Sequence, residues 1–141
     1  MRAAQAATLA RQASNMTPNK LFDRIASDCP SFRGVLGHHM KDQGELLSHL
    51  LMADLLRFIG SGLGTASNLE AQPPSHEEIR LILGILDQAF VAGDEATTDA
   101  ICLSFIEHIE TEPFFTDLEP MLGPALRAQH ARQREWWQHA R

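Results

Sequence analysis

The chain has 141 residues, of which 44% are hydrophobic and 21% are charged, and its formal net charge is −6. This length fits one domain with one core, and the composition argues against both a disordered tail and a membrane-spanning protein. The excess of acids argues against nucleic-acid binding, because nucleic-acid-binding proteins neutralise phosphates with Lys and Arg. Two cysteines, Cys29 and Cys102, are too few for a disulfide framework. We therefore expect a cytoplasmic protein with no nucleic-acid partner and no membrane partner.

The N-terminal residues 1–16 are rich in Ala and Arg, and we interpret them as a segment separate from a helical domain over residues 17–141. Thr17-Pro18 is typical of a helix N-cap followed by Pro in the first turn. An apolar stripe follows, and Pro30 ends this helix. A shorter helical stretch extends from Ser31 to about Met40.

A long central helix is predicted to begin at Asp42, because a broad apolar face follows it. This face consists of Leu46, Leu47, Leu50, Leu51, Leu55, Phe58 and Ile59. A loop rich in Gly, Ser and Pro comes next, over about residues 60–75. A connection of this length lets the chain cross the bundle.

Ser75 to Glu78 forms a capping-box pattern, which predicts a helix that ends at Gly93. Asp94 is the expected N-cap of a further helix, which Pro113 closes, and Gly123-Pro124 predicts a final basic helix. No alternation of polar and apolar residues indicates a strand. The sequence thus predicts an all-α, single-domain helical bundle of four substantial helices plus shorter ones. The residues expected to be buried together are Leu50, Leu51, Ile82, Leu86, Phe105 and Ile109.

The densest group of metal-ligand side chains is His39, Asp42, Glu45 and His49. If a helix begins at Asp42, then Asp42, Glu45 and His49 lie along one of its faces, with ligands of the kind that zinc and iron sites use. Their spacing matches no established metal-binding motif, so a solvated polar face is the simpler interpretation. No motif for a nucleophile or a phosphate loop is present either. We expect no catalytic residues and no cofactor.

Two adjacent tryptophans, Trp136 and Trp137, stand near the end of the final helix. Neighbouring side chains on a helix point about 100° apart, so both cannot face the same core. We expect at least one of them to be partly exposed. Ordinary packing and an interface anchor both remain open as roles for this pair.

Charge is distributed unevenly along the chain. Residues 1–41 carry a net charge of +4, residues 42–123 carry −13 and residues 124–141 carry +3. Because the inward positions of the helices are apolar, the acids of the middle segment are expected on outward faces, where they create a negative surface. Alternatively, the basic ends of the chain fold back over these acids and neutralise them. The acids predicted to bind a partner are Asp87, Asp94, Glu95, Asp99, Glu107, Glu110, Glu112, Asp117 and Glu119.

A series of core and cap patterns runs along about residues 21–126. These patterns are Cys29-Pro30-x-Phe32, His39-x-x-Asp42, the helix from Leu50 to Phe58, Ile82-Leu83-x-Ile85-Leu86, Ala92-Gly93-Asp94, Cys102-Leu103-Ser104-Phe105-Ile106-Glu107 and Leu122-Gly123-Pro124-x-Leu126. Together they resemble a family of small, all-helical bacterial proteins that look like toxin-immunity proteins. The resemblance implies a protein that binds and silences a cognate toxin, a role that needs a complementary surface and no active site.

The expected function is therefore an immunity-type binding protein that neutralises a bacterial toxin through its acidic surface. The partner would be a protein with a basic surface, for example a nuclease. Two alternatives stay open. One is a metal-dependent helical-bundle enzyme that uses His39, Asp42, Glu45 and His49, and the other is a helical homodimer that acts as a scaffold or regulator.

Overall fold

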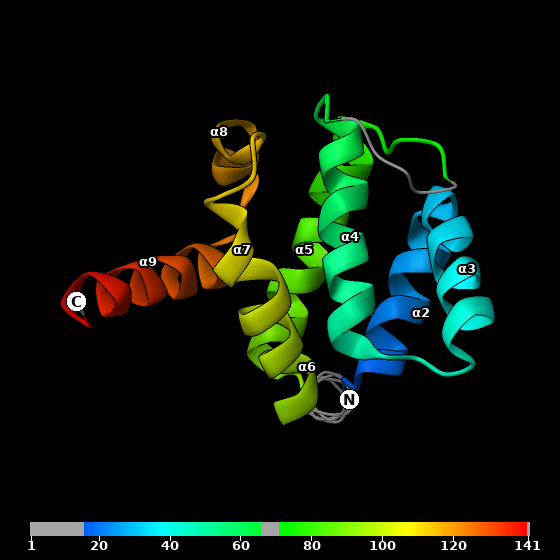
Figure 1. Ribbon diagram of the computed structural model, residues 1–141, viewed down its shortest axis with the longest axis horizontal. Helices are drawn as coiled ribbons and strands as arrows, with labels where there is room; N and C mark the ends of the chain where they lie inside the picture. The colour runs from blue at the N-terminus through cyan, green and yellow to red at the C-terminus, as the bar shows by residue number, and fades with distance from the viewer. Residues whose placement is uncertain (1–15, 66–70, 141) are drawn as a thin grey trace, which may run out of the picture.

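The computed structural model describes residues 16–65 and 71–140, and this part of the chain is mostly helical (Figure 1). The α-helices are α2 (Pro18–Asp28), α3 (Arg33–Gln43), α4 (Ser48–Gly62), α5 (His76–Ala92), α6 (Glu95–Ile101), α7 (Glu107–Ile109), α8 (Phe115–Leu118) and α9 (Pro124–His139). Two 3-10 turns, η1 (Pro30–Phe32) and η3 (Glu119–Met121), and one π-helical turn, η2 (Cys102–Ile106), join some of them. The described residues form no strand, only an isolated bridge between Met16 and Gly93. The all-α prediction is confirmed.

The helices α4 and α5 lie at the centre of the bundle, with α2 and α3 on one side and α6 to α8 on the other (Figure 1). The last helix, α9, packs on α5 and η2 and then extends away from the other helices (Figure 1). Of the helices in the described ranges, none has the length and apolar character needed to cross a membrane. The predicted N-terminal segment, residues 1–16, lies outside the described residues except for Met16.

The core contains three stacked or tilted phenylalanine rings, which join α2, η1 and α4. The ring centroids of Phe22 and Phe32 are 6.3 Å apart, and those of Phe32 and Phe58 are 5.5 Å apart. Five of the six residues predicted to be buried together are fully buried, namely Leu51, Ile82, Leu86, Phe105 and Ile109. The prediction was wrong for Leu50, which is 50% exposed. Leu50 lies in the first turn of α4, about 100° from the inward-facing Leu51.

Local capping signals are confirmed at three helix starts. The side chain of Thr17 accepts a hydrogen bond from the backbone N–H of Lys20, at 3.3 Å. Ser75 and Glu78 form the predicted reciprocal capping box, with both hydrogen bonds at 3.1 Å. Asp94 accepts a hydrogen bond from the backbone N–H of Thr97 at 2.8 Å. Each cap satisfies an N–H that the helix itself leaves without a partner.

The predicted helix start at Asp42 is wrong. Asp42 lies in the last turn of α3, which ends at Gly44. Gly44 has a φ of 75°, in the left-handed region that glycine adopts without a side-chain clash. The next helix, α4, begins only at Ser48. The helix expected after Asp94 also differs from the prediction, because the π-helical turn η2 interrupts it.

Candidate functional site

The N-terminus of α9 is held by Asp87, a residue of α5. One carboxylate oxygen of Asp87 accepts a hydrogen bond from the backbone N–H of Leu126, at 2.9 Å. Gly123 immediately precedes α9, and a Cβ at this position would overlap the Asp87 carboxylate, so glycine permits the close approach. Arg127 fastens the same end, because its guanidinium donates hydrogen bonds to three carbonyl oxygens. These belong to Glu119, Pro120 and Leu122, at 3.2–3.4 Å.

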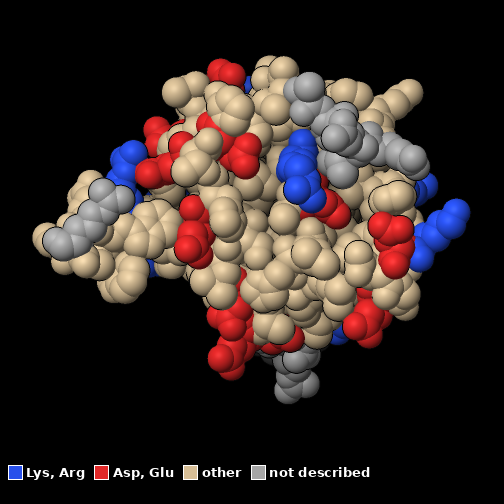
Figure 2. Space-filling model, viewed as in Figure 1, with Lys and Arg blue, Asp and Glu red and all other residues tan. Residues whose placement is uncertain are grey.

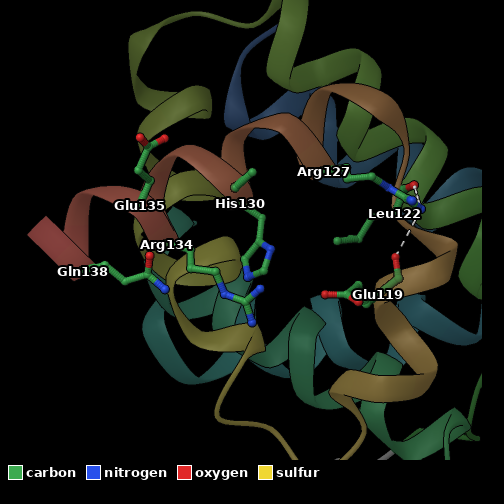
Figure 3. Close-up of a pocket in the computed structure, with 8 residues that line it drawn as sticks. Glu119, Leu122, Arg127, His130, Arg134, Glu135 and Gln138 are labelled. Atoms are coloured by element: carbon green, nitrogen blue, oxygen red, sulfur yellow. Dashed lines mark hydrogen bonds between the residues drawn. The ribbon is translucent and has the colours of Figure 1, made fainter.

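One turn further along, α9 is attached to Glu110, which follows α7. Arg134 Nε lies 2.6 Å from a carboxylate oxygen of Glu110, and His130 Nε2 lies 2.9 Å from the same oxygen. His130 is only 4% exposed, and its ring centroid lies 5.4 Å from that of Phe115. The side chains of His130 and Arg134 leave α9 on the same side, next to a cavity of about 310 Å³ (Figure 3). The basic helix thus neutralises one acid of the middle segment.

The remaining acids of this segment form a surface that we call the acidic strip. Residues 95–121 contain seven acids and no Lys or Arg. Apart from Glu110, none of the seven forms an ion pair within the described residues. Figure 2 shows acidic side chains along the side of the molecule that α6, α7 and α8 form. The acidic strip consists of the exposed Glu95, Asp99, Asp117 and Glu119 and the half-buried Glu107 and Glu112.

A groove, which we call the Trp136 groove, lies beside the strip, between α9 and the π-helical turn η2. It is lined by Leu103, Glu107, Gln129, Arg132, Gln133, Trp136 and Trp137. Leu103 is 50% exposed and Trp136 is 67% exposed, whereas Trp137 is half-buried. The two tryptophan side chains thus point in different directions, and the prediction that at least one of them is partly exposed is confirmed. Glu107 belongs to both the groove and the acidic strip. Exposed apolar side chains with a polar rim are typical of protein interaction sites, and π-helical turns often occur at functional sites.

The nine acids predicted to bind a partner have different surroundings. Asp87 caps α9 and Asp94 caps α6, so the structure gives both a role in holding helices. Glu110 was expected on the solvent side, and this was wrong, because it is paired with His130 and Arg134. The alternative prediction, that a basic end of the chain folds back and neutralises the acids, is confirmed at this one position. The other six form the acidic strip.

The predicted metal-ligand face is not formed. His39 is buried and accepts a hydrogen bond from the backbone N–H of Leu47, at 2.9 Å. Asp42 and Glu45 lie on either side of the Gly44 cap, and His49 Nδ1 lies 2.8 Å from the hydroxyl of Ser104. Asp42 and His49 therefore belong to different helices. Within the described ranges, His, Cys, Asp and Glu nowhere form a group of three or more that could hold a metal ion.

The two cysteines lie where a thiol keeps its proton. Cys29 is fully buried, and burial, together with the nearby charges of Glu78 and Asp28, raises its pKa to about 11. Burial and the charge of Asp99 also raise the pKa of Cys102. The guanidinium of Arg132 lowers this pKa and so offsets part of the rise. A nucleophilic cysteine needs a lowered pKa. Neither environment favours a reactive thiolate.

The sequence model of a family described as "Domain of unknown function (DUF7674)" matches residues 22–138. The chain belongs to this family. The DUF7674 match extends from α2 into the last turn of α9, so the bundle, the acidic strip and the Trp136 groove all lie inside the family domain. No curated protein and no solved structure matches the chain.

Leu103, whose exposed side chain lines the Trp136 groove, was not among the predicted functional residues. A signal for it exists in the sequence. In the helical stretch formed by α6, η2 and α7, the inward-facing apolar residues are Ile101, Phe105, Ile106 and Ile109. Leu103 lies outside this stripe, as a large apolar residue on the polar side of the helix. Its proximity to Trp136 depends on the path of α9, which no local pattern specifies.

Proposed function

We propose that this chain is an immunity-type binding protein, which neutralises a cognate bacterial toxin by covering a basic surface of the toxin with the acidic strip. The observation that carries the proposal is the strip itself. The six acids of the strip lie on one side of the bundle, and residues 95–121, which contain them, include no Lys or Arg. Within the described residues, none of the six forms an ion pair. The resemblance to immunity-like proteins supplies the class of partner.

Charge of this kind is suited to recognising a cationic protein. A surface of one sign attracts an oppositely charged partner and raises the association rate by ten- to a thousand-fold in favourable cases. It also rejects nucleic acid and other acidic molecules, since juxtaposed like charges are repelled. A nuclease is one suitable partner, because the surface with which it binds phosphates is basic. An acidic protein that covers such a surface blocks the substrate without any chemistry of its own.

The test uses the product of the gene adjacent to the one that encodes this chain. Co-expression of the two proteins is expected to restore growth to cells that the adjacent product alone arrests. The double variant Asp99→Lys/Glu107→Lys reverses two charges of the strip and is expected to abolish this protection. Glu110 is left unchanged, because its reversal would break the contacts with His130 and Arg134.

A matched control is Asp23→Lys/Glu45→Lys. Both control residues are exposed acids outside the strip: Asp23 lies in α2, and Glu45 directly follows the Gly44 cap of α3. The control is expected to protect cells as the native chain does. In binding measurements, the strip variant is expected to associate at least about tenfold more slowly. For the native chain, association slows between about 50 mM and about 300 mM salt, while dissociation changes less.

Two results would overturn the proposal. If co-expression gives no protection, the protein is not an immunity protein for that toxin. If protection is retained by the strip variant and binding is equally fast at both salt concentrations, the acidic strip is not the binding surface.

A further inference from the structure

The walls of the Trp136 groove come from two parts of the chain. Leu103 and Glu107 lie four residues apart, on the wall that η2 and α7 form. On α9, Arg132 and Gln133 lie one turn before Trp136, so these three side chains share one side of the helix. The groove has a volume of about 510 Å³, which is within the usual range of ligand pockets, about 300–1,000 Å³.

Each wall of the groove has an exposed apolar side chain. Leu103 and Trp136 are two of the six large apolar side chains that are exposed among the described residues. A single exposed apolar side chain is common, but two that come from different elements and line one groove favour the burial of an apolar group between them. The indole of Trp136 has a further property, since it is the aromatic ring that attracts cations most strongly.

The charges of the groove favour a cation. Glu107 is half-buried and forms no ion pair within the described residues. Glu107 is also a member of the acidic strip, whose side of the molecule is negative (Figure 2). Arg132 has the opposite sign, but its guanidinium donates two hydrogen bonds to the side chain of Gln129, at 2.9 and 3.1 Å. The groove thus offers apolar surface next to a carboxylate without a cation.

Lys and Arg have side chains that match this combination, because each has an apolar stem and a positively charged end. We propose that the Trp136 groove receives a lysine or arginine side chain of the partner protein, with its stem against Leu103 and Trp136 and its charged end paired with Glu107. The proposal rests on the proposed function for the identity of the partner, and it names what the toxin inserts beside the strip.

The acidic strip and the groove would then contribute to different rates. The charges of the strip attract the partner over a distance and so raise the association rate. A side chain that is enclosed in the groove has to leave it before the complex separates, so it lowers the dissociation rate. Tryptophan is also among the residues that most often dominate the binding energy of protein interfaces.

Tryptophan fluorescence of the isolated protein tests the groove without the toxin. The chain has two tryptophans and both line the groove, so their emission reports on this site. N-acetyl-lysine methylamide, added at constant ionic strength in the millimolar range typical of weak ligands, is expected to shift the emission. N-acetyl-norleucine methylamide has a similar stem without the charge, and its effect is expected to be about threefold smaller or less.

Glu107→Gln is expected to reduce the effect of the lysine probe by about the same factor and to leave the effect of the norleucine probe unchanged. The matched control is Glu45→Gln, which removes an exposed acid outside the groove and is expected to have no effect. Equal effects of the two probes, no effect of either, or an unchanged response of Glu107→Gln would each refute the proposal.

The product of the adjacent gene tests the same site in a complex. Leu103→Ala and Trp136→Ala are each expected to raise its dissociation rate at least about tenfold, with little change in the association rate. The control is Val91→Ala, which truncates a side chain on α5 that is 73% exposed and is expected to dissociate as the native chain does. Circular dichroism of each variant checks that the bundle is folded.

These measurements separate the groove from the proposed function. If the strip variant associates slowly while both groove variants dissociate as the native chain does, the groove proposal is refuted and the proposed function stands. If the product does not bind, the proposed function is refuted for that toxin, and the fluorescence measurements decide whether the groove takes a cationic side chain. If sedimentation shows that Trp136→Ala lowers the mass of the isolated protein, a second copy occupies the groove and the proposal is wrong.

Discussion

Replacing Asp87 tests whether this acid is a helix cap or a binding residue. The backbone N–H of Leu126 donates to the Asp87 carboxylate at 2.9 Å, and Leu126 is fully buried. In Asp87→Ala this N–H has no acceptor, and a buried donor without a partner costs about 1–3 kcal/mol. For a domain of this size, 1 kcal/mol shifts the midpoint of thermal unfolding by about 2–4 °C. We therefore expect Asp87→Ala to lower the midpoint by about 2–12 °C.

Asp87→Asn is the informative companion variant, because an amide oxygen still accepts the hydrogen bond. It removes only the attraction between a negative charge and the N-terminus of α9, which is worth about 0.3–1 kcal/mol. Asp23→Ala is the control for loss of an exposed acid and is expected to change the free energy of unfolding by less than about 0.5 kcal/mol. Thermal and urea unfolding, followed by circular dichroism, measure all three variants. Equal effects of Ala and Asn at position 87, or no effect of either, would refute the capping role.

Three further predictions concern the core and the buried thiol. Leu86→Ala removes a fully buried side chain and is expected to lower the free energy of unfolding by about 2–5 kcal/mol in urea denaturation. Gly60→Ala is expected to destabilise by about 1–3 kcal/mol, because a Cβ there overlaps the ring of Phe114, whereas Gly84→Ala, where a Cβ meets nothing, is expected to stabilise by about 0.5–1 kcal/mol. Between pH 9.0 and about 11 the unfolded chain loses the Cys29 proton and the folded chain keeps it, so the free energy of unfolding should fall as pH rises. Cys29→Ala should abolish this part of the fall, which urea titrations at about pH 8 and about pH 10 compare.

The helix starts that the sequence predicts correctly are those whose caps are local. Thr17, Ser75 and Asp94 each bond to a backbone N–H three residues further along, so the signal and its effect lie within one turn. The predicted helix start at Asp42 is wrong because two local signals compete at this point of the sequence. An acid before an apolar stretch is typical of a helix start, while Gly44 two residues later is typical of a helix end. The hydrogen bond from Leu47 to the buried His39 accompanies the second outcome, and it depends on tertiary packing.

For the acidic surface, too, some features follow from the local sequence and others depend on tertiary packing. The excess of acids in residues 42–123 is visible by counting, but which of these acids a partner can reach depends on α9. This helix uses Asp87 from 39 residues earlier as its cap and Glu110 as the partner of Arg134, so two of the predicted binding residues hold α9 in place. Because α9 turns Leu126 and His130 toward the bundle, Trp136 lies at the side of the helix, where it is 67% exposed. The position of one helix therefore decides which acids of the middle segment take part in holding the bundle and which apolar side chain is left exposed.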